Sequence, residues 1–187
     1  MGRKHVCNNG EAAHVFASQR ATASAIICLL AAIVKLKSDS IYASMYSMNK
    51  VVIDTSVLIS ALIGKTGPAR EVIRQCLLGD LKPLISTTLF LEYEAVSKRD
   101  KIKELCPLTE DEVSELLAAF FSVCEWVQIH YLWRPNLKDE GDNFLIELAV
   151  AGNAESIITN NLKDLKNAEL QFDGLKVLAP EDYLRGV

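Results

Sequence analysis

Short apolar runs rich in β-branched residues alternate with stretches of helical periodicity from residue 50 onward. The first run, KVVID at residues 50–54, is typical of a strand buried on both faces of a parallel sheet. Further strands are expected at residues 81–85, 126–130, 156–159 and 176–179, and helices at residues 57–62, 69–78, 87–97, 110–123, 142–151 and 180–185. Strands that alternate with helices predict an α/β fold, a three-layer α/β/α sandwich around a central parallel sheet of about four to five strands.

Polar residues mark several of the predicted helix starts. Thr55 and Ser56 are candidates to cap the first helix, and Ser86 begins the third. Thr109 followed by Glu112 forms a capping box, in which each side chain accepts a hydrogen bond from the other residue's backbone N–H. These local signals fix helix boundaries more sharply than the periodicity does.

The first 47 residues differ from the rest. They contain five basic and two acidic residues, a charge of +3, whereas residues 48–187 contain fifteen and twenty-two, a charge of −7. Their apolar run, residues 23–34, is shorter than the roughly 20 residues that span a bilayer, so no stable membrane insertion is expected. Three interpretations remain: a helix added to the fold, a membrane-proximal or export segment, and a stretch upstream of a true start at Met48. We favour the third, with residues 48–187 as the functional domain.

Composition and charge narrow the class of protein. The chain has 187 residues, of which 50% are hydrophobic, and a net charge of −4. This excludes a disordered chain and the broad basic footprint of a protein that holds nucleic acid by charge alone. No two of the five cysteines are spaced as a zinc-ligand pair, and the odd count does not suit a disulfide scaffold. A reducing, cytoplasmic location is therefore expected.

Acidic residues follow the predicted strands in order. Asp54 ends the first strand, and Glu92 lies in the helix after the second. Asp142 opens the helix before the fourth strand, with Asp139 just upstream as an alternative third acid. Since the carboxyl ends of parallel strands meet at one edge of the sheet, these side chains are expected to converge there.

The fourth predicted strand brings further polar residues to the same edge. It ends at Thr159, and Asn161 and Asp164 follow. Several carboxylates cannot share a small volume without compensation, because each raises the pKa of the others. Oxygen ligands of this kind suit Mg²⁺ or Mn²⁺, and one or two such ions can activate water against a phosphodiester.

Each acid also has a structural interpretation. An Asp at a strand end caps helices, a Glu on a long helix is usually solvated, and an Asp in the first helical turn is favoured by the helix dipole. What favours the functional interpretation is the joint placement of the acids after successive strands.

Four segments of the chain resemble the four ordered sequence blocks of the PIN domain (PilT N-terminus-like) family: VVIDTSVLISAL (51–62), STTLFLEYEAV (86–96), DEGDNFLIELAVAGNAESIIT (139–159) and TNNLKDL (159–165). The resemblance implies a Mg²⁺- or Mn²⁺-dependent nuclease that acts mainly on RNA. It also implies that the chain is the toxin of a bacterial toxin–antitoxin pair, with an antitoxin protein as partner and a homodimer as its assembly.

The same resemblance assigns roles to individual residues. The first, second and third acids of the family correspond to Asp54, Glu92 and Asp142. Thr55 or Ser56 would give a hydroxyl to the metal shell, and Thr159 would orient the first acid or a metal-bound water.

The fourth block departs from the family. Asn161 stands where many members have Asp, and Asp164 follows three positions later. The site then holds one metal ion more readily than two, or recruits Asp164. The rival hypothesis, a catalytically weak or inactive PIN-like module that binds nucleic acid or protein, is favoured by Asn161 and opposed by the three acids.

Few residues in the sequence indicate where RNA would bind. A basic cluster, Lys98, Arg99, Lys101 and Lys103, follows the helix of Glu92 and either touches phosphates or is a solvated helix end. Trp133 and Arg134 precede Asp139 and either stack on a base or lie against the core. Asp54-Thr55-Ser56 lacks the Gly of aspartic proteases and the second Asp of aspartyl phosphatases, and the histidines show no nucleophile–base spacing.

Overall fold

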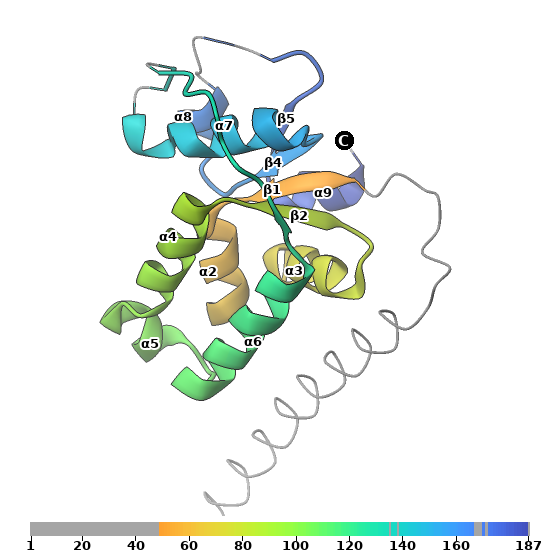
Figure 1. The fold of residues 1–187 in the computed structure, drawn as a ribbon. Coiled ribbons are helices and arrows are strands. Elements are labelled where there is room, and N and C mark those ends of the chain that lie inside the picture. The colour runs from red at the N-terminus through yellow and green to blue at the C-terminus, as the bar shows by residue number, and fades with distance from the viewer. Residues whose placement is uncertain (1–48, 135, 138, 167–169, 171, 187) are drawn as a thin grey trace, which may run out of the picture.

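The computed structural model describes residues 49–134, 136–137, 139–166, 170 and 172–186 (Figure 1). The predictions for residues 1–47 and the proposed start at Met48 lie outside the described residues.

A five-stranded parallel sheet forms the centre of the structure. Its strands are β1 (Lys50–Ile53), β2 (Lys82–Ile85), β3 (Glu125–Trp126), β4 (Ser156–Ile158) and β5 (Lys176–Leu178). They lie in the order β3-β2-β1-β4-β5, and every neighbouring pair is parallel. The predicted fold class is therefore confirmed.

Helices cover both faces of this sheet. They are α2 (Thr55–Ile63), α3 (Pro68–Leu78), α4 (Thr87–Ser97), α5 (Asp100–Leu105), α6 (Glu110–Val123), the short 3₁₀ helix η1 (Glu140–Asp142), α7 (Asn143–Gly152), α8 (Leu162–Lys166) and α9 (Pro180–Arg185). Figure 1 shows α7 on one side of the sheet, with α2, α3, α4 and α6 on the other. No helix within the described ranges combines the length and hydrophobicity needed to cross a membrane.

The central strand β1 anchors the core. Val51, Val52 and Ile53 have no exposed surface, because β2 and β4 flank the strand and helices cover it from both faces. Burial of a side chain of this size contributes about 1.5–3 kcal/mol. The most hydrophobic strand is thus also the one that carries Asp54 at its carboxyl end.

Two predicted helix starts are confirmed by their caps. The Ser86 hydroxyl accepts a hydrogen bond from the Leu89 N–H at 3.3 Å, and both halves of the capping box between Thr109 and Glu112 are present. At the first helix the prediction was wrong, since Asp54 rather than Thr55 or Ser56 occupies the N-cap position.

Other boundaries differ for physical reasons. The third strand was predicted at residues 126–130 but consists only of Glu125–Trp126. Ile85 is the last residue of β2, and its carbonyl accepts a hydrogen bond from the Val127 N–H. Beyond this point the edge strand β3 has no neighbouring strand to pair with. The helices α5 and α8 have six and five residues, too few for a helical period to show in the sequence.

Gly152 allows α7 to lie close against β2. A Cβ at this position would be 2.3 Å from Leu84 Cδ1 and 3.1 Å from Val127 Cγ2. Leu84 is itself fully buried in the sheet, so it has little room to move aside. Glycine at residue 152 therefore sets the distance between the sheet and the helix that begins after Asp142.

We expect Gly152→Ala to destabilise the fold by about 1–3 kcal/mol, because overpacking outweighs the gain of up to about 1 kcal/mol in helix propensity. Urea unfolding followed by circular dichroism measures the change. Ala151→Ser, at the exposed neighbouring position, is the matched control and should change stability by no more than about 0.5 kcal/mol. Equal unfolding midpoints for the two variants would contradict the close approach.

Candidate active site

The candidate site lies where the order of the strands reverses. The chain adds β2 and β3 on one side of β1 and then crosses to add β4 and β5 on the other. In open parallel sheets this reversal leaves a crevice at the carboxyl ends of the two central strands. Asp54 follows β1 and Thr159 follows β4, so these two residues border the crevice.

Asp54 spans the crevice through a single carboxylate oxygen. Its Oδ2 accepts hydrogen bonds from Ser56 Oγ and from Thr159 Oγ1, each at 2.6 Å. The side chain makes no capping hydrogen bond to α2, although the residue occupies the N-cap position. The structural interpretation of Asp54 as a helix cap therefore does not account for its carboxylate.

The two hydroxyls that hold Asp54 are themselves held by the chain after β4. Thr159 has no exposed surface, and its Oγ1 accepts a hydrogen bond from the Asn161 N–H at 2.8 Å. Ser56 Oγ accepts one from the Asn160 N–H at 3.2 Å, and Asn160 Nδ2 donates to the Ser56 carbonyl at 3.0 Å. This network fixes the Asp54 carboxylate in one orientation.

Glu92 is brought to the site by its neighbour on α4. The hydroxyl of Tyr93, a fully buried residue, donates a hydrogen bond to the Ile53 carbonyl at the last residue of β1. Burial raises the pKa of Tyr93 well above its usual value, so the phenol remains a neutral donor. Because Tyr93 ties α4 to the end of β1, Glu92 lies beside Asp54.

The Glu92 carboxyl is half-buried and surrounded by charge. Burial is the largest cause that raises its pKa, and the negative charges of Asp54 and Asp142 raise the pKa further. The Thr55 hydroxyl and Arg99 act in the opposite direction. Thr55 Oγ1 faces this carboxyl without the geometry of a hydrogen bond, and it is buried without a partner among the described residues.

Asp142 completes the group of three acids. Its side chain is half-buried and does not cap α7. Burial is the largest cause that raises its pKa, and the negative charges of Asp139, Asp54 and Asp164 raise the pKa further. The structure therefore brings Asp54, Glu92 and Asp142 within electrostatic reach of one another from three separate elements.

The remaining acids lie at the rim. Asp139 is exposed, and its Oδ1 accepts a hydrogen bond from the Gly141 N–H at 2.9 Å at the start of η1. Asp164 and Asn161 are also exposed, and the Asn161 side-chain amide donates to Asp164 Oδ2. Asp139 and Asp164 act on the site through their charges, which raise the pKa of Asp142.

The donor set fits a hard divalent cation in its chemistry. Three carboxylates and one buried, unpartnered hydroxyl offer only oxygen ligands, as Mg²⁺ and Mn²⁺ prefer. Within the described ranges, however, no group of three or more Asp, Glu, His or Cys side chains is arranged closely enough to hold a metal ion. The carboxylates thus stand farther apart than in a closed coordination shell.

Several residues that build the site were not predicted from the sequence. Tyr93 and Asn160 were given no role in the site. Glu147 is 1% exposed within the otherwise uncharged helix α7, NFLIELAVAG, and pairs with Arg134 at 3.0 Å. A single charge in an apolar helix is the signal that could have revealed this ion pair.

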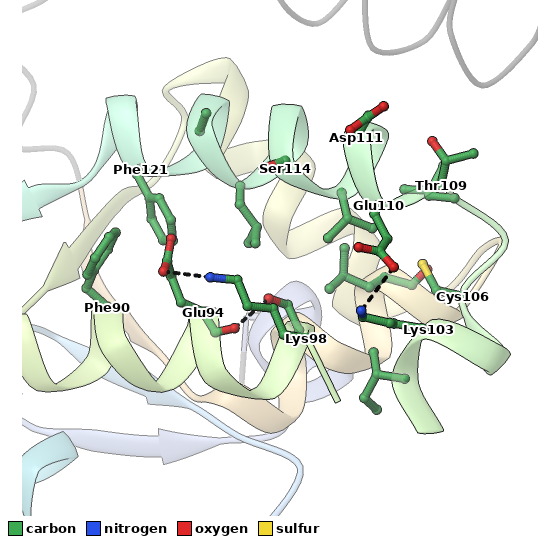
Figure 2. A pocket seen from close by; sticks show the side chains of 17 residues that line it. Phe90, Glu94, Lys98, Lys103, Cys106, Thr109, Glu110, Asp111, Ser114 and Phe121 are labelled. Atoms are coloured by element: carbon green, nitrogen blue, oxygen red, sulfur yellow. Dashed lines mark hydrogen bonds and ion pairs between the residues drawn. The ribbon is translucent and has the colours of Figure 1, made fainter. Parts of the chain in front are cut away.

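A second concavity, of about 550 Å³, lies between α4, α5 and α6 and contains none of the three acids (Figure 2). Glu94 at its rim is two residues from Glu92, about 200° around the helix, and so faces away from the site. Lys98 pairs with Glu94 at 3.0 Å, and Lys103 pairs with Glu110 at 2.9 Å. Two members of the predicted basic cluster are therefore engaged in ion pairs.

A model of the PIN domain family matches residues 50–163, the span that carries β1, the three acids and Thr159. No curated protein matches the chain. PIN domains are generally nucleases and typically use a divalent metal ion, so the match supports hydrolysis as the class of chemistry.

The raised pKa values predict how the metal-free protein responds to pH. A carboxyl whose pKa is raised by folding binds its proton more tightly in the native state, so stability falls as pH rises above the ordinary pKa of 4.5 for Glu92. We expect Glu92→Gln to raise the melting temperature in EDTA at neutral pH by a few degrees, where about 2–4 °C corresponds to 1 kcal/mol. The gain should shrink toward pH 4, where Glu92 is already protonated in the native state.

Glu94→Gln, on the same helix but facing away, is the matched control and should show no such gain at neutral pH. Thermal unfolding at both pH values checks the prediction. A lower melting temperature for Glu92→Gln at neutral pH, or an equal effect at both pH values, would show that Glu92 is not in a like-charge cluster.

Proposed function

Because the chain belongs to the PIN domain family, whose model matches well over half of its 187 residues, we propose that it is a metal-dependent ribonuclease. It hydrolyses phosphodiester bonds in RNA with Mg²⁺ or Mn²⁺. The observation that carries this proposal is the convergence of Asp54, Glu92 and Asp142, in which the Glu92 and Asp142 carboxyls have pKa values raised by burial and by their neighbours.

Asp54, Glu92 and Asp142 are the ligands in this proposal, with the orphaned Thr55 hydroxyl close to Glu92. Their mutual repulsion is the reason why a cation is needed, since the charged forms of all three acids are stabilised together only by positive charge. When bound, the divalent ion supplies that charge and the Lewis acidity that hydrolysis of a phosphodiester requires. Asp54 after β1, Glu92 on α4 and Asp142 at the end of η1 would hold it.

The surrounding residues orient the acids. Ser56 and Thr159 hold Oδ2 of Asp54 and so fix the direction of its other oxygen. Asp164 or Asn161 would complete the set of ligands from the rim, where the two side chains are hydrogen bonded to each other. Asp139 contributes charge from the loop before Asp142.

The cellular role and the assembly of the nuclease are a further part of the proposal. We propose that the nuclease is the toxin of a toxin–antitoxin pair, with a protein antitoxin and a homodimeric assembly. Their support is the family resemblance. The net charge of −4 agrees with an RNA contact made through a bound cation rather than through a basic surface.

The second candidate function is a PIN-like module that binds nucleic acid or protein without cleaving RNA. Asn161 favours it, because an amide brings no charge to the fourth position. The open arrangement of the described carboxylates favours it too. The three half-buried acids count against it, since a pure binding surface gains nothing from their repulsion.

The experiment is cleavage of labelled single-stranded RNA by the full chain with Mn²⁺, with Mg²⁺ and with EDTA. We expect cleavage only with metal, and a loss of at least about 100-fold in each of Asp54→Asn, Glu92→Gln and Asp142→Asn. Single-stranded DNA of the same sequence tests the preference for RNA.

Glu94→Gln is the matched control for Glu92→Gln and should cleave as the wild type does. Asp139→Asn distinguishes the two candidates for the third acid, because it should retain activity if Asp142 holds that role. Metal-dependent cleavage that survives Asp54→Asn would overturn the assignment of the site. Metal binding without cleavage of any RNA would favour the binding module.

A further inference from the structure

Three consecutive exposed side chains stand out in the loop between β3 and η1. Tyr131 is 78% exposed, Leu132 65% and Trp133 39%, and we call these residues the aromatic loop. The other large hydrophobic side chains that are exposed among the described residues are separated along the chain: Leu91, Leu105, Trp126 and Leu170. Exposed apolar side chains that occur together usually mark a binding surface.

A buried carboxylate fixes the backbone of this loop. Glu147 Oε1 accepts hydrogen bonds from the Trp133 N–H at 3.1 Å and from Arg134 Nε at 3.0 Å. Its Oε2 accepts one from Arg134 Nη2 at 3.2 Å. A carboxylate buried to this degree is costly to leave unpaired, so the loop is held firmly against α7.

Further contacts hold the loop at Trp133 and in the residues that follow it. The Trp133 ring lies edge-on to Phe172, with centroids 5.5 Å apart and an interplanar angle of 72°. Asn136 Oδ1 accepts a hydrogen bond from the Leu170 N–H at 2.6 Å, and the Leu137 N–H donates to Asn143 Oδ1 at 2.9 Å. The Trp133 end of the aromatic loop is therefore held in place.

The same helix connects this loop to the acids. Glu147, which binds the loop, lies on α7 five residues after Asp142, the N-cap of that helix. At about 1.5 Å per residue, the two positions are roughly 7.5 Å apart along the helix axis. That span corresponds to about two stacked nucleotides at about 3.4 Å each.

Attraction between opposite charges does not explain how the aromatic loop would bind a ligand such as RNA. Arg134 gives two of its N–H groups to Glu147, so the cation next to Trp133 is already paired. Residues 48–187 carry a charge of −7, which repels phosphates. Aromatic stacking, by contrast, binds any unpaired base and depends little on charge.

We propose that Tyr131 and Trp133 form a stacking platform for unpaired bases of the single-stranded RNA whose backbone reaches the acids. The inference rests on the proposed function, since it assigns the substrate strand of that site to this surface. It implies a preference for unpaired over duplex RNA, because bases inside a helix cannot stack on a protein side chain.

The two tryptophans of the chain allow a direct test. In full-length Asp54→Asn protein, which keeps the RNA intact, Trp126→Phe leaves Trp133 as the reporter and Trp133→Phe leaves Trp126. We expect an unstructured oligouridylate to quench Trp133 fluorescence and to leave Trp126 unchanged. A duplex of the same length should quench neither.

Affinity provides a second readout. Tyr131→Ala should raise the dissociation constant by about 5-fold or more, the lower end of one stacking contact, and should leave the melting temperature unchanged. Leu105→Ala, at an exposed apolar position on α5, is the matched control and should bind as the parent does. Raising salt from about 50 to 200 mM should weaken binding far less than the 10³–10⁵-fold of charge-driven complexes.

The outcomes separate this inference from the nuclease. Metal-dependent cleavage without quenching of Trp133 overturns the platform and leaves the nuclease intact. Quenching of Trp133 without cleavage by the protein that retains Asp54 supports the platform and overturns the nuclease. Equal quenching of both tryptophans, or a Trp133 signal that changes with protein concentration before RNA is added, also overturns the platform, and the latter result assigns the surface to a protein contact.

Discussion

The hydrogen bond between the Thr159 hydroxyl and the Asp54 carboxylate crosses the point where the two halves of the sheet meet. It depends on β1 and β4 being neighbours, which in turn depends on the long crossover through α7. Both residues follow strands whose apolar side chains are buried, so the core fixes their positions. The other two acids are then placed relative to Asp54, Glu92 through Tyr93 and Asp142 through α7. A single polar contact thus sets the geometry around which the acids gather.

The cluster carries an electrostatic cost that the rest of the fold offsets. Glu92 and Asp142 both have raised pKa values, because burial and neighbouring carboxylates disfavour their charged forms. Strained or repulsive groups of this kind are concentrated at functional sites, where a ligand relieves them. The carboxylate that holds the aromatic loop differs from these acids. Glu147 on α7 is buried but paired with Arg134, and it stabilises one conformation of the loop. The repulsion among the acids is uncompensated, whereas the charge of Glu147 is compensated by Arg134.

The parts of this structure that could be predicted depend on local or periodic signals. The parallel sheet, the cap at Ser86 and the capping box at Thr109 follow from neighbours in the sequence, and the acids were placed by the strands they follow. Tyr93 and Asn160 could not be predicted, because their partners lie 40 and 104 residues away along the chain. The length of β3 was wrong for the same reason, since an edge strand ends where its neighbour does. Spacing also could not show that the acids stand apart rather than in a closed shell.

The most direct test of the shared cation site is calorimetric titration of Mn²⁺ into the full chain in two buffers of different ionisation enthalpy. Burial and the neighbouring carboxylates raise the pKa values of Glu92 and Asp142, so a cation that binds them at about pH 5.5, just above ordinary carboxyl pKa values, should displace protons. We expect Mn²⁺ to bind with release of protons, the release to decline as pH rises, and both binding and release to be lost in Glu92→Gln. Mn²⁺ binding without proton release, or binding that Glu92→Gln leaves unchanged, would contradict a site formed by these carboxylates.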